Sequence, residues 1–210
     1  MSPRQKTDEG QRYEIMSVYE RAAREDGFTL IAGIDEAGRG PLAGPVVAAA
    51  CILDPSVPIL GVNDSKKLSP ARREALFQEI IQHAVGYAIA QIEPDVIDRI
   101  NILQATLSAM RLTVERLPVR PDLLLIDAVD LKGIPVPVRP IIKGDALSVS
   151  IAAASILAKV TRDRLMDQYD TVYPGYGFIR HKGYGTAEHY AALDRLGPTP
   201  IHRQSFLKNR

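Results

Sequence analysis

Four carboxylates of this 210-residue sequence could bind metal ions: Asp35, Glu36, Asp127 and Asp145. Carboxylates a few ångströms apart repel one another, and either raised pKa values or a bound cation relieves the repulsion. Ligation by oxygen alone, with no His or Cys nearby, favours Mg²⁺ or Mn²⁺ over zinc. Two such ions about 4 Å apart can activate water and stabilise the leaving oxygen of a phosphodiester. Together these residues predict a two-metal-ion hydrolase, whereas any one alone is typical of a solvated turn.

Each carboxylate follows a predicted buried strand. The strands and their carboxylates are 28–34 with Asp35 and Glu36, 123–126 with Asp127, and 138–142 with Asp145. Sites in α/β sheets form outside the carboxyl ends of strands. We therefore expect Asp35, Glu36 and Asp127 to converge, whereas Asp145 lies at a strand-to-helix junction.

The rest of the chain predicts an α/β fold. Apolar runs indicate further strands over 46–53 and 85–92, and three- and four-residue spacing indicates helices over 11–26, 71–83, 95–117, 147–169 and 187–196. Strands come first and then alternate with helices, which is typical of a mixed central β-sheet flanked by helices. We divide the chain into an N-terminal helical appendage (1–26), a catalytic domain (27–172) and a small C-terminal helical extension (173–210).

The composition indicates a soluble protein. At 46% hydrophobic residues the chain can bury one good core. Its longest apolar run, 42–53, contains Pro45 and is shorter than the roughly 20 residues that span a bilayer. The single cysteine, Cys51, has no disulfide partner and is expected to be a small buried side chain. We expect a cytoplasmic, monomeric protein, with its protein partners unknown.

Basic residues gather near the C-terminus, where a nucleic-acid backbone could lie. They are Arg180, Lys182, Arg195, Arg203, Lys208 and Arg210, against only Glu188 and Asp194. The alternative is a solvated surface on which these charges cluster by chance. The histidines have no zinc-site spacing and are interpreted as structural; they are His83, His181, His189 and His202.

A glycine-rich segment, 38–45, follows the first two carboxylates. It matches neither a dinucleotide-binding loop nor a P-loop. Glycines on both sides of Arg39 let the main chain approach a sugar-phosphate backbone, including a 2′-hydroxyl. The alternative is a tight turn.

These residues resemble the signature of the type 2 ribonuclease H (ribonuclease HII) family. The signature is Gly33-Ile34-Asp35-Glu36-Ala37-Gly38-Arg39-Gly40-Pro41-Leu42-Ala43-Gly44-Pro45-Val46. Further motifs follow in the family's order, at 63–68, 126–127, 143–145, 150–160 and 181–186. The resemblance runs from about Leu30 to Phe206. Type 3 enzymes share the carboxylate pair but lack Gly-Arg-Gly, so residues 38–40 favour type 2.

The resemblance implies a ribonuclease H-like fold and an endonuclease with two Mg²⁺ or Mn²⁺ ions at the four carboxylates. Its substrates would be the RNA strand of RNA/DNA hybrids and single ribonucleotides embedded in duplex DNA, cut on the 5′ side to leave 5′-phosphate and 3′-hydroxyl ends. Gly38, Arg39 and Gly40 would read the 2′-hydroxyl at the RNA–DNA junction, and Tyr184 would stack on the neighbouring deoxyribose. Without the resemblance, Tyr184 would be interpreted as a loop anchor.

Four lysines would then contact phosphates: Lys66, Lys67, Lys143 and Lys182. Lysines in loops are otherwise typical of solvated surface.

A fifth carboxylate, Asp163, competes with Asp145 for the metal site. If residues 146–163 form one straight helix, its rise separates the two by roughly 27 Å, so both cannot bind one ion. We choose Asp145, which is nearer the strand ends, and expect Asp163 to pair with the neighbouring arginines.

The alternative function is a module that binds structured nucleic acid without cutting it. Intact carboxylates at all four positions argue against this, because anionic groups facing phosphate weaken binding unless a metal intervenes.

Overall fold

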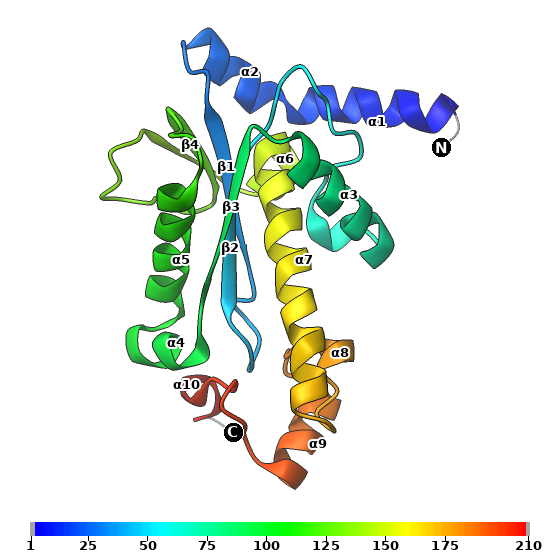
Figure 1. The fold of residues 1–210 in the computed structure, drawn as a ribbon, viewed down its shortest axis with the longest axis vertical. Helices are drawn as coiled ribbons and strands as arrows, with labels where there is room; N and C mark the ends of the chain where they lie inside the picture. Colours follow the sequence, from blue (N-terminus) through cyan, green and yellow to red (C-terminus); the bar gives the residue numbers. More distant parts are fainter. Residues whose placement is uncertain (1–2, 209–210) are drawn as a thin grey trace.

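The fold is built on a five-stranded mixed sheet, seen edge-on in Figure 1. The computed structural model describes residues 3–208, with side chains from residue 8 onward. Strand order is β3-β2-β1-β4-β5, with β1 antiparallel to β2, β2 antiparallel to β3, and β1, β4 and β5 parallel. The bounds are Ile31–Ala37 (β1), Val46–Ile52 (β2), Gly86–Ile92 (β3), Leu123–Asp127 (β4) and Val138–Ile141 (β5). The predicted α/β class with a mixed, helix-flanked sheet is confirmed.

Helices cover both faces of the sheet. Helix α5 (Ile102–Arg116) lies on one face and α7 (Val149–Val172) on the other. Alternate residues of a strand point to opposite faces, and β2 shows both directions: Val47 and Ala49 pack with α7, whereas Ala48 and Ala50 pack with α5. Because both faces are covered, all of β2 is buried, and Cys51 is a buried free thiol as predicted.

Gly33 allows α7 to lie directly against β1. A Cβ atom at this position would be 2.0 Å from the carbonyl carbon of Ser150, a distance no side chain tolerates. The absence of a side chain brings the first turn of α7 onto the strand that carries Asp35. Close packing here thus sets how near the helix comes to the carboxylates.

Some boundaries differ from the sequence predictions. Strand β1 does not end before Asp35, because pairing with β2 continues to Ala37 opposite Val47. The helix predicted over 95–117 is two helices, α4 (Pro94–Ile100) and α5. Asn101 separates them: its φ is 67°, and its side chain accepts a hydrogen bond from the backbone N–H of Gln104, which starts a new helix.

The helix predicted over 11–26 is likewise two helices, which are separated at Ser17, whereas the remaining predicted helices form close to their expected limits. Ser69 caps α3 (Pro70–His83) by accepting a hydrogen bond from Arg72, and α9 (Ala187–Leu196) has its predicted bounds. The short elements are α6 (Gly144–Leu147), α8 (Phe178–His181), α10 (Gln204–Leu207) and a 3₁₀ turn, η1 (Ser65–Lys67). In the described part of the chain, no helix is long and apolar enough to cross a membrane.

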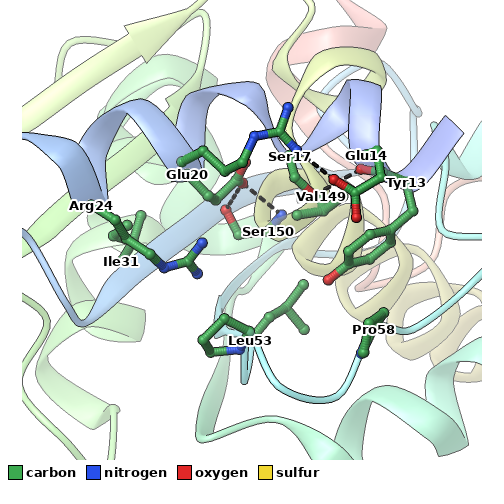
Figure 2. Close-up of a pocket in the computed structure, with 12 residues that line it drawn as sticks. Tyr13, Glu14, Ser17, Glu20, Arg24, Ile31, Leu53, Pro58, Val149 and Ser150 are labelled. Carbon is green, nitrogen blue, oxygen red and sulfur yellow. Dashed lines mark hydrogen bonds and ion pairs between the residues drawn. The ribbon is translucent and has the colours of Figure 1, made fainter. Parts of the chain in front are cut away.

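The N-terminal helices, α1 (Pro3–Met16) and α2 (Val18–Glu25), pack on the start of α7. Glu20 of α2 is buried, and its Oε1 accepts hydrogen bonds from the Ser148 hydroxyl (2.5 Å), the Ser150 hydroxyl (2.6 Å) and the Ser150 N–H (3.0 Å). Figure 2 shows this carboxylate beside Ser150 in the pocket beneath α2. A negative charge at a helix N-terminus is favourable, so Glu20 completes the cap of α7. The division of the chain at residues 26 and 172 stays a prediction.

We expect Glu20→Ala to destabilise the protein by about 1–3 kcal/mol, because it leaves buried donors at Ser148 and Ser150 without their acceptor. Glu14→Ala is the matched control. Glu14 pairs with Arg21 at 2.7 Å on the surface, and its removal should change the free energy of unfolding by less than about 0.5 kcal/mol. Urea denaturation of the two variants measures both values. Equal effects would contradict a capping role for Glu20.

Candidate active site

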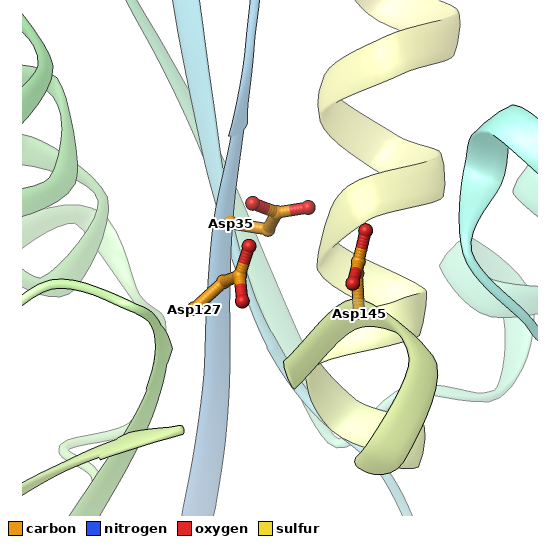
Figure 3. Close-up of side chains that lie close together, drawn as sticks. All are labelled: Asp35, Asp127 and Asp145. Atoms are coloured by element: carbon orange, nitrogen blue, oxygen red, sulfur yellow. The ribbon is translucent and has the colours of Figure 1, made fainter. Parts of the chain in front are cut away.

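Asp35, Asp127 and Asp145 converge on one point (Figure 3). Ile34 lies opposite Ile126 in the parallel pairing of β1 and β4, which places Asp35 beside Asp127 at the next position. Ligand atoms of all three carboxylates lie within 4.8 Å of one another. Three of the four predicted carboxylates thus come together from two strands and a helix.

Asp145 reaches this point from α6, the short helix between β5 and α7. The N-terminus of α6 is fixed by a 2.7 Å hydrogen bond from the backbone N–H of Gly144 to Oδ1 of Asp127. Lys143 precedes it in the left-handed conformation, with φ 59°. The Asp127 carboxylate therefore holds the backbone next to Asp145 in place.

Glu36 is outside this cluster of three. Neighbouring residues of a strand point to opposite faces, so the side chains of Glu36 and Asp35 leave the strand in opposite directions. Its Oε1 accepts a hydrogen bond from Arg39 at 3.4 Å, and its buried Oε2 has no hydrogen-bond partner among the described residues. The fourth predicted carboxylate is nearby but not gathered with the others.

Burial makes negative charge costly at this site. Burial and the charge of Glu36 raise the pKa of Asp35 well above its usual value, although a hydrogen bond with Ser155 acts in the opposite direction. Burial also raises the pKa of Glu36, against the influence of Arg39. The pKa of Asp145 is raised by burial and by Asp64. Such shifts are what closely spaced buried carboxylates produce without a compensating cation.

Two buried arginines hold the loop between β1 and β2. Arg162 of α7 donates hydrogen bonds to the carbonyl oxygens of Ala43 (2.9 Å), Pro45 (3.0 Å) and Lys182 (3.0 Å). Arg203 donates to those of Gly38 (2.6 Å), Arg39 (2.9 Å) and Gly44 (2.8 and 3.0 Å). Both side chains are almost completely buried.

Gly38 lies so close to the guanidinium group of Arg162 that no side chain fits at this position. Its φ is 94°, and a Cβ atom would be 2.0 Å from Nε of Arg162. A non-glycine residue would face both backbone strain and a clash. The first glycine of Gly-Arg-Gly is thus explained by local packing.

The loop and Tyr184 line a common pocket of about 260 Å³, which also includes Glu36, Lys66 and Ser155. The Tyr184 ring lies beside Gly40, since a Cβ built on that glycine would be 3.7 Å from Cε1 of the ring. The ring is 45% exposed, so a ligand could reach it. Residues separated by about 145 positions in the chain therefore form one surface next to the carboxylates.

The predicted phosphate-contacting lysines lie in different surroundings. Nζ of Lys66 is 3.7 Å from Oδ2 of Asp145 at the pocket's edge. Lys67 and Lys143 are exposed, and Lys182 forms an ion pair with Asp167. Only Lys66 of the four lines the pocket with Tyr184.

The basic C-terminal residues do not form one free cationic face. Arg203 is fully buried and cannot meet a phosphate. Arg180 pairs with Glu188, and Arg195 donates to the carbonyl oxygen of Gly175. Lys208 is exposed, whereas Arg210 lies outside the described residues. The predicted charge cluster is largely used in internal contacts.

Asp163 is part of an ion-pair group away from the carboxylate cluster. Its partners are Lys159 (2.7 Å) and Arg73 (3.8 Å), not the adjacent arginines expected from sequence. Arg162 and Arg164 point elsewhere, to loop carbonyls and to Glu74. The choice of Asp145 over Asp163 agrees with the observed grouping.

Sequence reasoning missed several residues of this site: Asp64, Ser155, Arg162 and Arg203. Asp64 and Ser155 lie inside stretches that resemble family motifs, at 63–68 and 150–160. Their location in these stretches is the signal by which Asp64 and Ser155 could have been found from the sequence. For the arginines, the only signal was a charged residue within an apolar helix or beside an aromatic segment.

Comparisons with known proteins identify the family of this chain. A family model described as ribonuclease HII matches residues 32–209. The ribonuclease HII of Desulfitobacterium hafniense (strain Y51) is 58% identical over 94% of this chain and 76% of its own length. That of Geobacter sulfurreducens is 61% identical over 89% of this chain and 85% of its own length. The ribonuclease H2 of Pyrococcus horikoshii OT3 superposes with a TM-score of 0.71, at 30% identity, over 84% of this chain and 93% of that one. The chain belongs to the ribonuclease HII family, endonucleases that act on RNA/DNA hybrids.

Proposed function

We propose that this enzyme also cuts on the 5′ side of single ribonucleotides embedded in duplex DNA, as a step in their removal. The observation that carries this is the position of Tyr184 beside Gly40, in a pocket that includes Glu36. A ring next to a glycine-rich main chain can contact one sugar by stacking and its neighbour by hydrogen bonds. This arrangement supports recognition of a junction between two kinds of sugar.

Divalent cations fit the carboxylate cluster. Three carboxylates with ligand atoms within 4.8 Å, two of them buried and Asp127 partly buried, offer only oxygen, the ligand type that Mg²⁺ and Mn²⁺ prefer. We propose that Asp35, Asp127 and Asp145 hold the ions and that Glu36, close by in β1, is the fourth ligand. When bound, two such ions would supply an activated water and stabilise the leaving oxygen, which gives 5′-phosphate and 3′-hydroxyl ends.

The chain's own residues bind and orient the substrate in this proposal. The backbone of Gly38 and Gly40, with Arg39, faces the ribose, and Tyr184 stacks on the neighbouring deoxyribose. Lys66, at the pocket's edge, is placed to contact a phosphate near the carboxylates. Lys67, Lys143 and Lys182 are assigned to more distant phosphates, and Lys182 would have to leave Asp167 to do so. A cytoplasmic location is part of the same proposal.

The test is cleavage of a labelled DNA duplex with one embedded ribonucleotide, in Mg²⁺, Mn²⁺ or EDTA, beside an all-DNA duplex. We expect one metal-dependent cut on the 5′ side of the ribonucleotide and an intact control. Asp145→Asn should lower the cleavage rate by more than about 100-fold. Mutating a residue that only supports a metal ligand typically costs about 10- to 100-fold, and loss of the ligand itself should cost more.

Asp163→Asn is the matched control, since it removes the competing carboxylate but leaves the cluster intact. Its rate should stay within about 10-fold of the parent. A larger loss with Asp163→Asn than with Asp145→Asn would reverse the ligand assignment. Binding of the duplex without cleavage under every metal condition would favour the non-catalytic module.

For Tyr184→Ala, we expect cleavage at the single ribonucleotide to fall about 5- to 150-fold, the value of one stacked group at about 1–3 kcal/mol. Cleavage of a long RNA/DNA hybrid should fall less, because it offers no RNA–DNA sugar junction at most positions. Tyr19→Ala, an exposed tyrosine of α2, is the control. Equal losses on both substrates would show that Tyr184 makes a general contact.

The raised pKa of Asp35 predicts how the metal-free protein responds to pH. A group with a raised pKa stabilises the fold at low pH, and this stabilisation is lost as pH rises from the usual value of 3.8 through the raised one. Asp35→Asn should therefore be more stable than the parent at neutral pH. Each kcal/mol of relieved repulsion raises Tm by about 2–4 °C in a protein of this size, and added Mg²⁺ should stabilise only the parent.

Asp122→Asn provides a control of opposite sign. Hydrogen bonds from Thr29 and Leu30 outweigh burial and lower the pKa of Asp122, so its stabilisation is present at neutral pH and lost on acidification. This variant should be less stable than the parent at neutral pH. Thermal melts across the pH range compare all three proteins, and a destabilised Asp35→Asn would contradict the repulsion.

A further inference from the structure

Three histidines interpreted as structural from sequence gather beneath Tyr184. His181, His189 and His202 are all buried. The rings of His181 and His189 stack at 4.5 Å between centroids, and Nε2 of His189 lies 3.0 Å from Nε2 of His202. Phe178 packs its ring edge-on against His189. The cluster joins α8, α9 and the segment before α10.

The hydrogen bonds of His189 and His202 have only one consistent direction. Nδ1 of His202 lies 2.9 Å from the backbone N–H of Thr199, which can only donate. The neutral ring of His202 therefore carries its proton on Nε2 and donates it to Nε2 of His189. That leaves the proton of His189 on Nδ1, which donates to the carbonyl oxygen of Tyr184 at 2.9 Å.

This relay ends on the backbone of the residue that lines the substrate pocket. The Tyr184 carbonyl accepts from His189 and from the N–H of Thr186, and the Tyr184 N–H donates to the carbonyl of His181. The ring of His181 is fixed in turn, because its Nδ1 accepts from the N–H of Gly183 while its Nε2 lies 2.8 Å from the carbonyl oxygen of Tyr176. Both polar groups of the Tyr184 main chain are thus held by the cluster.

The same segment is tied to the glycine-rich loop. The N–H of Leu42 donates to the carbonyl of Gly183 at 2.8 Å, and Arg162 binds the carbonyl of Lys182. The position of Tyr184 relative to Gly40 therefore depends on these loop contacts on one side and on the histidines on the other.

We propose that His189 and His202 are positioning residues that hold the Tyr184 ring beside Gly40 and so set discrimination at the RNA–DNA junction. This inference rests on the proposed role of Tyr184. The histidines touch no reacting atom; they act through the peptide group of Tyr184. The direction of the relay requires one proton between Nε2 of His202 and Nε2 of His189, with His189 in the Nδ1–H form.

Proton positions give the first test. Long-range ¹H–¹⁵N spectra of the histidine rings, recorded at mildly alkaline pH where imidazole is neutral, should show His189 as Nδ1–H and both His181 and His202 as Nε2–H. Exposed His83 supplies a reference signal. Finding His189 as Nε2–H would overturn the relay.

Selectivity gives the second test, measured as kcat and KM on the single-ribonucleotide duplex and on a long hybrid. His189→Leu should lower selectivity for the junction about 5-fold or more, the lower limit for one stacked group. His189→Asn, whose amide N–H occupies the position of Nδ1, should restore most of it. Combining His189→Leu with Tyr184→Ala should add no further loss.

Phe178→Leu is the control for packing, because it disturbs the same cluster but no hydrogen bond of the relay. Its Tm should fall while junction selectivity stays unchanged. If Tyr184→Ala loses selectivity and His189→Leu does not, the inference fails and the proposed function stands. If Tyr184→Ala itself keeps full selectivity, the proposed role of Tyr184 fails and the inference with it.

Discussion

The site depends on two buried guanidinium groups that bind main-chain carbonyls instead of carboxylates. Arg162 and Arg203 together engage six carbonyl groups, five of them in the loop after β1. In the described part of the chain neither is within ion-pair distance of a carboxylate. Burial lowers the pKa of Arg162 to about 10 and that of Arg203 to about 9, so both stay charged at neutral pH. A buried charge without its hydrogen bonds is costly, which makes the loop's conformation a condition of stable folding.

This constraint joins the two halves of the candidate site. The carboxylates come from the sheet and from α6, whereas Tyr184 comes from the C-terminal segment. The loop held by the arginines is the connection between them, since it begins at Gly38, directly after the strand that carries Asp35, and packs beside the Tyr184 ring. The histidines then fix the far side of the same segment. The candidate site is thus positioned by main-chain anchoring more than by surface charge, and most of the C-terminal basic residues are engaged in internal contacts.

Much of the fold was predictable from sequence because local signals agreed with the global pattern. Buried strands were continuous apolar runs, and Ser69 with Pro70 marked a helix start. Asp35, Asp127 and Asp145 could be grouped because each follows a strand predicted from the sequence. Other features could be recognised only in the three-dimensional structure. The direction of Glu36, the positive φ of Asn101 and the burial of Arg203 depend on pairing and packing, which periodicity does not encode.

The parallel pairing of β1 with β4 affects the order in which the chain folds. Ile31 lies opposite Leu123, so the two strands that carry Asp35 and Asp127 pair through residues that are 92 positions apart in the sequence. Contacts this distant in sequence form slowly, because closing the intervening chain loses entropy before it gains contacts. The carbonyl groups of the loop between β1 and β2 form their hydrogen bonds with Arg203 later still, when residue 203 has packed against the loop. A partly folded chain therefore lacks the assembled carboxylate cluster, and under the proposed function nuclease activity would appear only when the fold is complete.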